Sequence, residues 1–162
     1  MSSSHKNLSD FSHIAIKNAQ NLKFAIVVSQ WNAEITGALL NGAIDGLINN
    51  GTLEEDIKII EVPGSYELIS GADIALRNKA FDAIICLGCV IQGETRHFDF
   101  ICDAVANGIS NVSIKYNKPV IFGVLTTNNL QQAIDRAGGK HGNKGEEAAI
   151  TAIQMAHISK DF

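Results

Sequence analysis

The sequence predicts an α/β fold, a three-layer α/β/α sandwich whose four-stranded parallel sheet has helices on both faces. Four short apolar runs rich in β-branched residues alternate with segments of helical periodicity. The runs are almost continuously apolar, as is typical of strands covered on both faces. A strand–helix–strand order also requires crossover connections, which join parallel strands with a right-handed turn.

In the first half of the chain, residues 23–29 form a β-branched run that predicts the first strand. Apolar residues at helical spacing predict a helix through residues 35–47, which an Asn-Asn-Gly sequence ends. Residues 56–62 form the second predicted strand, terminated by a Pro-Gly pair. Helical periodicity then returns over residues 65–78.

In the second half, apolar runs predict the third and fourth strands at residues 81–91 and 118–126. Helical patterns follow at residues 95–115, 128–137 and 146–158. A glycine-rich break, residues 138–145, separates the last two helices. The resulting layout is flavodoxin-like.

Length and composition predict a single domain over residues 13–162, after a flexible polar tail at residues 1–12. The net charge of −4 argues against a nucleic-acid partner or an anionic membrane surface. Three cysteines, an odd number, do not favour a disulfide framework, and no apolar run has the length of a membrane span. We therefore expect a cytoplasmic protein. Residues 12–16 remain unplaced and are a candidate arm that pairs with a sheet edge, its own or a neighbour's.

Polar and aromatic residues follow every predicted strand. The four segments are Ser29-Gln30-Trp31-Asn32, Pro63-Gly64-Ser65-Tyr66-Glu67, residues 93–97 and Thr126-Thr127-Asn128. Ligands of open parallel sheets bind beyond the carboxyl ends of the strands. The sequence therefore predicts one site at this edge.

Thr95, Arg96 and His97 are predicted in the first turn of the helix that follows the third strand. A helix N-terminus offers unpaired N–H groups to an anion, and an imidazole transfers protons near neutral pH. Asp99 is a candidate orienting partner for His97. The alternative is a solvent-facing histidine that only helps to open a helix.

Arg136 stands just before the glycine-rich break, and Lys144 stands near its end. A guanidinium fork suits phosphate and an ammonium adds a point charge, although both could be ordinary surface cations. The sequence contains neither a Walker A pattern nor a GxGxxG after the first strand, which argues against a nucleotide fold. An enzyme that acts on a small phosphorylated molecule is favoured.

Trp31 is the only tryptophan and is placed just after a strand, where it could stack on a heterocycle or cover the next helix. Cys86 and Cys89 have a C-x-x-C spacing, but residues three apart on one strand point to opposite faces. We therefore expect no metal site there and interpret both thiols, like that of Cys102, as buried core groups.

Taken together, these segments resemble the 6,7-dimethyl-8-ribityllumazine synthase family. The resemblance covers residues 14–158, and its most specific parts are Gly93-Glu94-Thr95-Arg96-His97 and the stretch from Arg136 to Gly145. It implies condensation of 5-amino-6-ribitylaminouracil with 3,4-dihydroxy-2-butanone 4-phosphate to the lumazine, phosphate and water. This is the penultimate step of riboflavin biosynthesis, and the family uses no metal or organic cofactor.

The resemblance also implies residue roles. Trp31 would stack on the pyrimidine ring, where many members carry Phe, and His97 would carry protons. The other contacts to the ribitylaminouracil would be Ser65, Tyr66, Glu67, Cys89, Val90, Ile91 and Phe122. The butanone phosphate would meet Glu94, through its backbone N–H, together with Thr95 and Arg136, and Lys144 would add supporting charge.

Members of this family form homo-pentamers, and some assemble into icosahedral shells of sixty subunits. Their sites lie between subunits, so Phe122, Arg136 and Lys144 would come from the neighbour. Besides its small-molecule substrates and other copies of itself, riboflavin synthase is a further candidate partner. Two alternatives remain open: a different sugar-phosphate enzyme on the same fold, and a non-catalytic flavin- or pterin-binding carrier.

Overall fold

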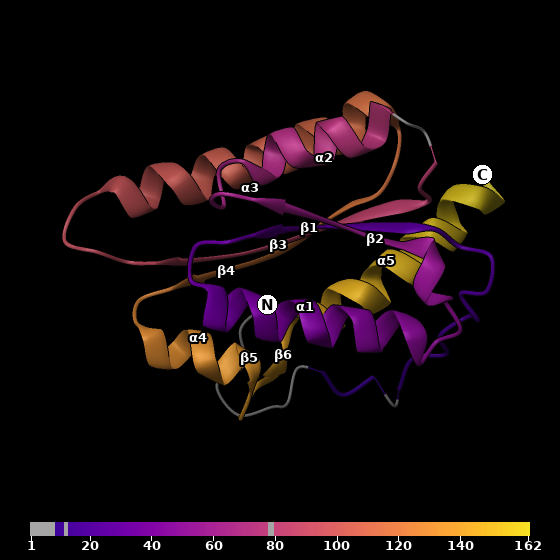
Figure 1. Ribbon diagram of the computed structural model, residues 1–162, viewed down its shortest axis with the longest axis horizontal. Helices are drawn as coiled ribbons and strands as arrows, with labels where there is room; N and C mark the ends of the chain where they lie inside the picture. Colours follow the sequence, from indigo (N-terminus) through magenta and orange to yellow (C-terminus); the bar gives the residue numbers. More distant parts are fainter. Residues whose placement is uncertain (1–8, 12, 78–79) are drawn as a thin grey trace.

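The computed structural model describes residues 9–11, 13–77 and 80–162. Its centre is a parallel sheet of four strands in the order β2-β1-β3-β4 (Figure 1). The strands are β1 (Phe24–Ser29), β2 (Ile57–Val62), β3 (Ala83–Ile91) and β4 (Val120–Thr127). The predicted α/β class and the four parallel strands are confirmed.

Helices cover both faces of the sheet (Figure 1). Two lie on one face, α2 (Leu68–Arg77) and α3 (His97–Tyr116). Three lie on the other, α1 (Ala33–Ile48), α4 (Leu130–Arg136) and α5 (Lys144–Asp161). A short 3₁₀ helix, η1 (Glu54–Asp56), precedes β2. The three-layer sandwich predicted from the sequence is therefore correct.

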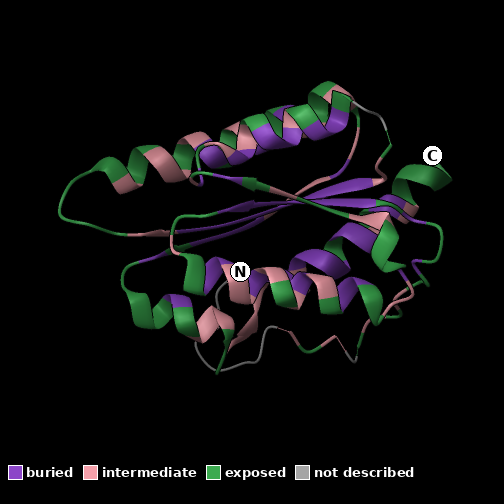
Figure 2. Cartoon of the chain, viewed as in Figure 1, coloured by how far each residue is buried: buried purple, intermediate pink, exposed green. Residues whose placement is uncertain are grey.

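Every residue of β1 is buried, which explains its unbroken apolar sequence. Phe24, Ile26 and Val28 pack into the core beneath α1 and α5, whereas Ala25 and Val27 pack into the core beneath α2 and α3. Figure 2 shows the buried residues gathered along the sheet and on the helix faces that meet it. The two faces of one strand thus hold both helical layers in place.

The helix α5 crosses the molecule beneath the sheet and packs against α1 (Figure 1). At its start, Gly145 lies so close to the backbone carbonyl of Leu39 that a side chain there would collide with it. The Asn143 side chain accepts a hydrogen bond from the Gly145 N–H at 2.8 Å and so caps the helix. This packing fixes where the first residues of α5 lie.

The predicted boundaries differ from the structure in two informative places. The glycine-rich break is an antiparallel hairpin, β5 (Ala137–Gly139) and β6 (Gly142–Asn143), and not an irregular loop. Gly138 and Gly142 have φ values of 107° and 84°, which glycine adopts without strain. In addition, α2 and α3 begin at Leu68 and His97, so the predicted helix starts at residues 65 and 95 are wrong.

Most of the tail predicted at residues 1–12 lies outside the described residues, so its flexibility stays a prediction. Within it, Ser9 shares two hydrogen bonds with the backbone of Asn143. Ser12 of the candidate arm is also outside the described residues, and residues 13–16 form no strand, although Ile16 packs against the core. None of the helices described in residues 9–11, 13–77 and 80–162 is both long and apolar enough to span a membrane.

Candidate functional site

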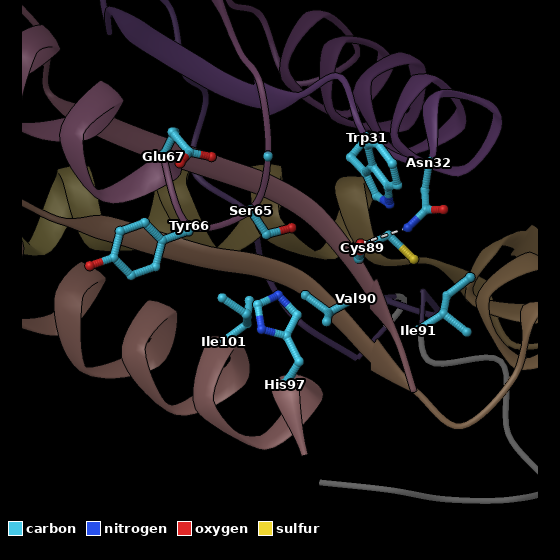
Figure 3. A pocket seen from close by; sticks show the side chains of 11 residues that line it. Trp31, Asn32, Ser65, Tyr66, Glu67, Cys89, Val90, Ile91, His97 and Ile101 are labelled. Atoms are coloured by element: carbon cyan, nitrogen blue, oxygen red, sulfur yellow. Dashed lines mark hydrogen bonds between the residues drawn. The ribbon is translucent and has the colours of Figure 1, made fainter. Parts of the chain in front are cut away.

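A pocket of about 580 Å³ opens at the carboxyl edge of the sheet (Figure 3). Much of the predicted site lines it: Trp31, Ser65, Tyr66, Glu67, Cys89, Val90, Ile91 and His97. The segments that follow β1, β2 and β3 therefore converge, as the strand order predicts. Thr126 and Thr127, at the end of β4, are not among the residues that line this pocket.

Trp31 stands on the pocket rim, where 73% of its surface is exposed. Its backbone N–H donates to the carbonyl of Pro63 at 3.1 Å, and the N–H of Gln30 donates to Val62 at 2.8 Å. These bonds join the turn after β1 to the turn after β2. The exposed indole face is thereby held over the pocket and is free to stack on a planar ring.

Residues 63–67, which follow β2, form a turn that leads into α2. The Glu67 N–H donates to the carbonyl of Gly64 at 3.2 Å. Ser65 is buried and packs directly over Gly88 of β3, where a methyl carbon would lie only 2.6 Å from the serine oxygen. This wall of the pocket therefore depends on a glycine at position 88.

His97 is the first residue of α3, and its ring extends toward the pocket (Figure 3). Its backbone N–H donates to Oγ1 of Thr95 at 3.4 Å. Glu94 and Thr95 occupy the exposed turn just before it and do not line the pocket. Asp99 contacts Nε of Arg96 through Oδ2 at 3.5 Å, so its carboxylate is directed to the arginine.

Arg136 and Lys144 lie on the other helical layer and do not line this pocket. Both approach one carboxylate: Nη1 of Arg136 is 2.7 Å from Oε1 of Glu147, and Nζ of Lys144 is 3.3 Å from Oε2. The first contact is an ion pair without the angle of a hydrogen bond. Nη1 also donates to the backbone carbonyl of His141 at 2.8 Å. The Arg136 side chain is half-buried, and its contacts with Glu147 and with the His141 carbonyl hold the guanidinium in one orientation.

Phe122 lines a separate hollow between α3 and the outer edge of β4. Within one subunit the structure therefore brings together His97 and the predicted ribitylaminouracil contacts other than Phe122. The residues left outside the pocket are Glu94, Thr95, Phe122, Arg136 and Lys144. The contribution of Phe122, Arg136 and Lys144 from a neighbouring subunit stays a prediction.

Cys89 packs in the core between the sheet and α1 and α5, whereas Cys86 packs in the core between the sheet and α2 and α3. This confirms that the two side chains point to different faces of β3. Burial raises the pKa of the Cys86 thiol to about 12 and that of Cys89 to about 11. Both remain neutral thiols at physiological pH, and Cys89 forms part of the pocket wall. Across the described part of the chain, no group of three or more His, Cys, Asp or Glu is placed to hold a metal ion.

Sequence reasoning missed Ile101 and Glu147, and it placed Asn32 and Gly64 at the site edge without giving either a role. Asn32, Gly64 and Ile101 line the pocket, and Glu147 joins the two cations. Ile101 is four residues after His97 on one helix and so shares its face, a signal that the sequence carried. Asn32 and Gly64 stand beside predicted residues in the same turns. The role of Glu147 depends on the β5–β6 hairpin, which brings the start of α5 close to the end of α4, and has no local signal.

Comparison with known proteins matches residues 21–160 to the family model for 6,7-dimethyl-8-ribityllumazine synthase. A protein of that name from Cytophaga hutchinsonii is 59% identical over 155 residues, which are 96% of this chain and 97% of the relative. One from Flavobacterium johnsoniae is 52% identical and covers 98% of this chain and 83% of its own length. One from Christiangramia forsetii is 51% identical, with 99% and 96% covered. This chain belongs to the 6,7-dimethyl-8-ribityllumazine synthase family.

Proposed function

We propose that the pocket between Trp31 and His97 is where this enzyme condenses 5-amino-6-ribitylaminouracil with 3,4-dihydroxy-2-butanone 4-phosphate. The products are 6,7-dimethyl-8-ribityllumazine, phosphate and water, and the reaction is the penultimate step of riboflavin biosynthesis. The observation that carries the assignment is the convergence of an exposed indole, an imidazole and three strand-end segments on one cavity.

The pyrimidine ring stacks on the open face of Trp31, and its edge meets the backbone of Cys89, Val90 and Ile91. The lining of the cavity supports this arrangement, because the indole and the end of β3 both belong to it (Figure 3). The ribityl chain lies along Ser65, Tyr66 and Glu67 in the turn before α2. Half-exposed Tyr66 adds apolar surface at the mouth.

The butanone phosphate binds at the turn before α3, where backbone N–H groups of Glu94 and Thr95 and the helix N-terminus favour an anion. Arg136 completes this subsite from a neighbouring subunit, with Lys144 adding positive charge. The ion pair with Glu147 supports this role, because it holds the guanidinium in one orientation before substrate arrives.

In the reaction, the amine attacks the ketone and loses water to give a Schiff base, and phosphate then leaves. The second amine closes the ring on the remaining carbonyl with loss of a second water. Each step moves a proton, and the His97 imidazole, at the pocket wall, relays it. Donors around the phosphate stabilise the charge that develops as it departs. Holding two reactive partners in register supplies much of the acceleration.

We further propose a homo-pentamer that assembles into an icosahedral shell. Two different surfaces support a ring. One is the groove between α2 and α3, where the exposed Ile74 stands beside the charged Asp73, and the other is the apolar β4 edge with Phe122 and the exposed Ile114. A contact between two unlike surfaces closes into a ring when the rotation allows it. The Val120–Thr127 edge carries no charged side chain to prevent pairing. Light scattering that finds only single pentamers at working concentration would contradict the shell.

We also propose that the protein is located in the cytoplasm. Its three cysteines are free thiols, which supports a reducing compartment. Riboflavin synthase, which takes up the lumazine product, is proposed as a partner.

The test of function is direct. Purified protein mixed with both substrates should produce lumazine absorbance and fluorescence, and should release one phosphate per lumazine formed. A protein that binds riboflavin tightly and forms no lumazine would instead be a carrier. Release of phosphate without lumazine would indicate a different sugar-phosphate reaction.

A further inference from the structure

The strand β3 extends past its neighbour β1 at the pocket. The two strands pair from Phe24↔Ala83 to Val28↔Leu87, and β1 ends one residue later at Ser29. The chain of β3 continues to Ile91. One side of its last residues therefore has no strand beside it.

The direction of the exposed peptide groups follows from two hydrogen bonds. Ile84 N–H donates to Pro119 and Gln92 N–H donates to Thr127, so the even-numbered amides of β3 face β4. Peptide groups alternate along a strand, so the groups of Cys89 and Ile91 face the opposite side. That side is the one on which β1 has ended and the pocket opens.

Asn32 fills part of this gap with its side chain. Its Nδ2 donates to the backbone carbonyl of Cys89 at 2.9 Å, across 57 residues of sequence (Figure 3). Asn32 adopts the left-handed conformation, with φ 60° and ψ 47°, directly before α1. An asparagine in this position ordinarily caps its own helix, yet its side chain makes no cap hydrogen bond. The Asn32 side-chain amide therefore hydrogen-bonds to β3 and does not cap α1.

We propose that Asn32 is a positioning residue that sets where the pyrimidine ring lies along β3. The Asn32 amide occupies the Cys89 carbonyl. The next peptide group on that side is therefore that of Ile91, two residues or about 6.6 Å further along the strand. The same bond anchors the turn that carries Trp31. The indole and the ring-binding peptide are thus kept in one register. This inference rests on the proposed function of the pocket.

The test compares Asn32→Asp and Asn32→Gly in the full-length enzyme. Aspartate keeps the size and the left-handed conformation but presents an acceptor to the Cys89 carbonyl, and glycine keeps only the conformation. The matched control is Asn117→Gly, because Asn117 is also left-handed, with φ 48°, but ends α3 away from the pocket. Steady-state rates are measured with each substrate varied in turn. Emission of the only tryptophan reports the indole directly.

We expect both Asn32 variants to raise KM for ribitylaminouracil about 10-fold, with little change in kcat or in KM for the butanone phosphate. Trp31 emission should shift, and its quenching by the pyrimidine substrate should weaken. Asn117→Gly should leave all of these values unchanged.

A purely structural role for Asn32 would lower thermal stability and affect both substrates equally, and that result would overturn the proposal. A Trp31→Ala variant distinguishes a failure of the positioning role of Asn32 from a failure of the pocket assignment. If Trp31→Ala raises the pyrimidine KM but Asn32→Asp does not, only the positioning role is wrong. If neither changes it, the pocket assignment fails and the proposal fails with it.

Discussion

Replacing Gly88 by alanine would put a methyl group between β3 and the turn that forms one wall of the pocket. The added carbon would lie 2.6 Å from Oγ of Ser65 and 2.9 Å from a methyl carbon of Leu68. Ordinary contacts begin at 3.4 Å, so Ser65 would have to retreat by about 0.8 Å. Ser65 is 7% exposed and has little free space into which to move.

Overpacking of this size costs about 1–3 kcal/mol of unfolding free energy. The displaced turn also carries Tyr66 and Glu67, so the site should change together with the stability. A displacement near 1 Å can reduce the rate by up to about 100-fold when it misaligns bound reactants. We expect Gly88→Ala to raise KM for ribitylaminouracil more than KM for the butanone phosphate.

The assay combines urea unfolding with steady-state rates. Gly37→Ala is the matched control, because Gly37 lies inside α1 and an added carbon there meets nothing within 4 Å. This control should gain up to about 1 kcal/mol of stability, since alanine favours a helix, and should keep its kinetics. The reasoning would be refuted if Gly88→Ala matched the wild type in both unfolding and pyrimidine KM.

Three further outcomes are expected. His97→Ala should lower kcat about 100-fold without abolishing lumazine formation, because binding still holds the reactants together; undiminished turnover would remove His97 from the mechanism. Arg136→Ala should raise KM for the butanone phosphate about 10- to 100-fold while KM for the pyrimidine stays the same. Hydrogen bonds from Lys115 and Arg77 lower the Asp73 pKa to about 2. A lowered pKa stabilises the fold above about pH 4, and this contribution disappears as the pH falls toward 2. Because Lys115 and Arg77 are solvent-exposed, Asp73→Asn should cost only about 1 kcal/mol in urea unfolding at neutral pH, and only a small part of that near pH 2.

The architecture was predictable because its strands are buried on both faces, which leaves unbroken apolar runs such as Phe24–Ser29. The convergence of Trp31, the Ser65 turn and His97 was also predictable, since the carboxyl ends of parallel strands meet at one edge. These features depend on local patterns and on the general geometry of parallel sheets.

Other features depend on contacts between segments distant in sequence. The hairpin around Gly138 and Gly142 forms where Asn143 both caps α5 and donates to the carbonyl of Ala38 on α1. The hydrogen bond from Asn32 to Cys89 forms only because β3 extends beyond the end of β1. The register between two strands cannot be predicted from the sequence of either strand alone. The pairing of Glu147 with Arg136 likewise requires the β5–β6 hairpin to bring the start of α5 close to the end of α4.

The course of α5 also determines where the chain can be modified. Its 18 residues cover about 27 Å, and they carry the C-terminus to the end of the molecule opposite the turn between β3 and α3 (Figure 1). Phe162 is fully exposed there. A dye or peptide extension attached to this terminus should therefore leave substrate access intact, which makes it the natural attachment point for immobilising the protein.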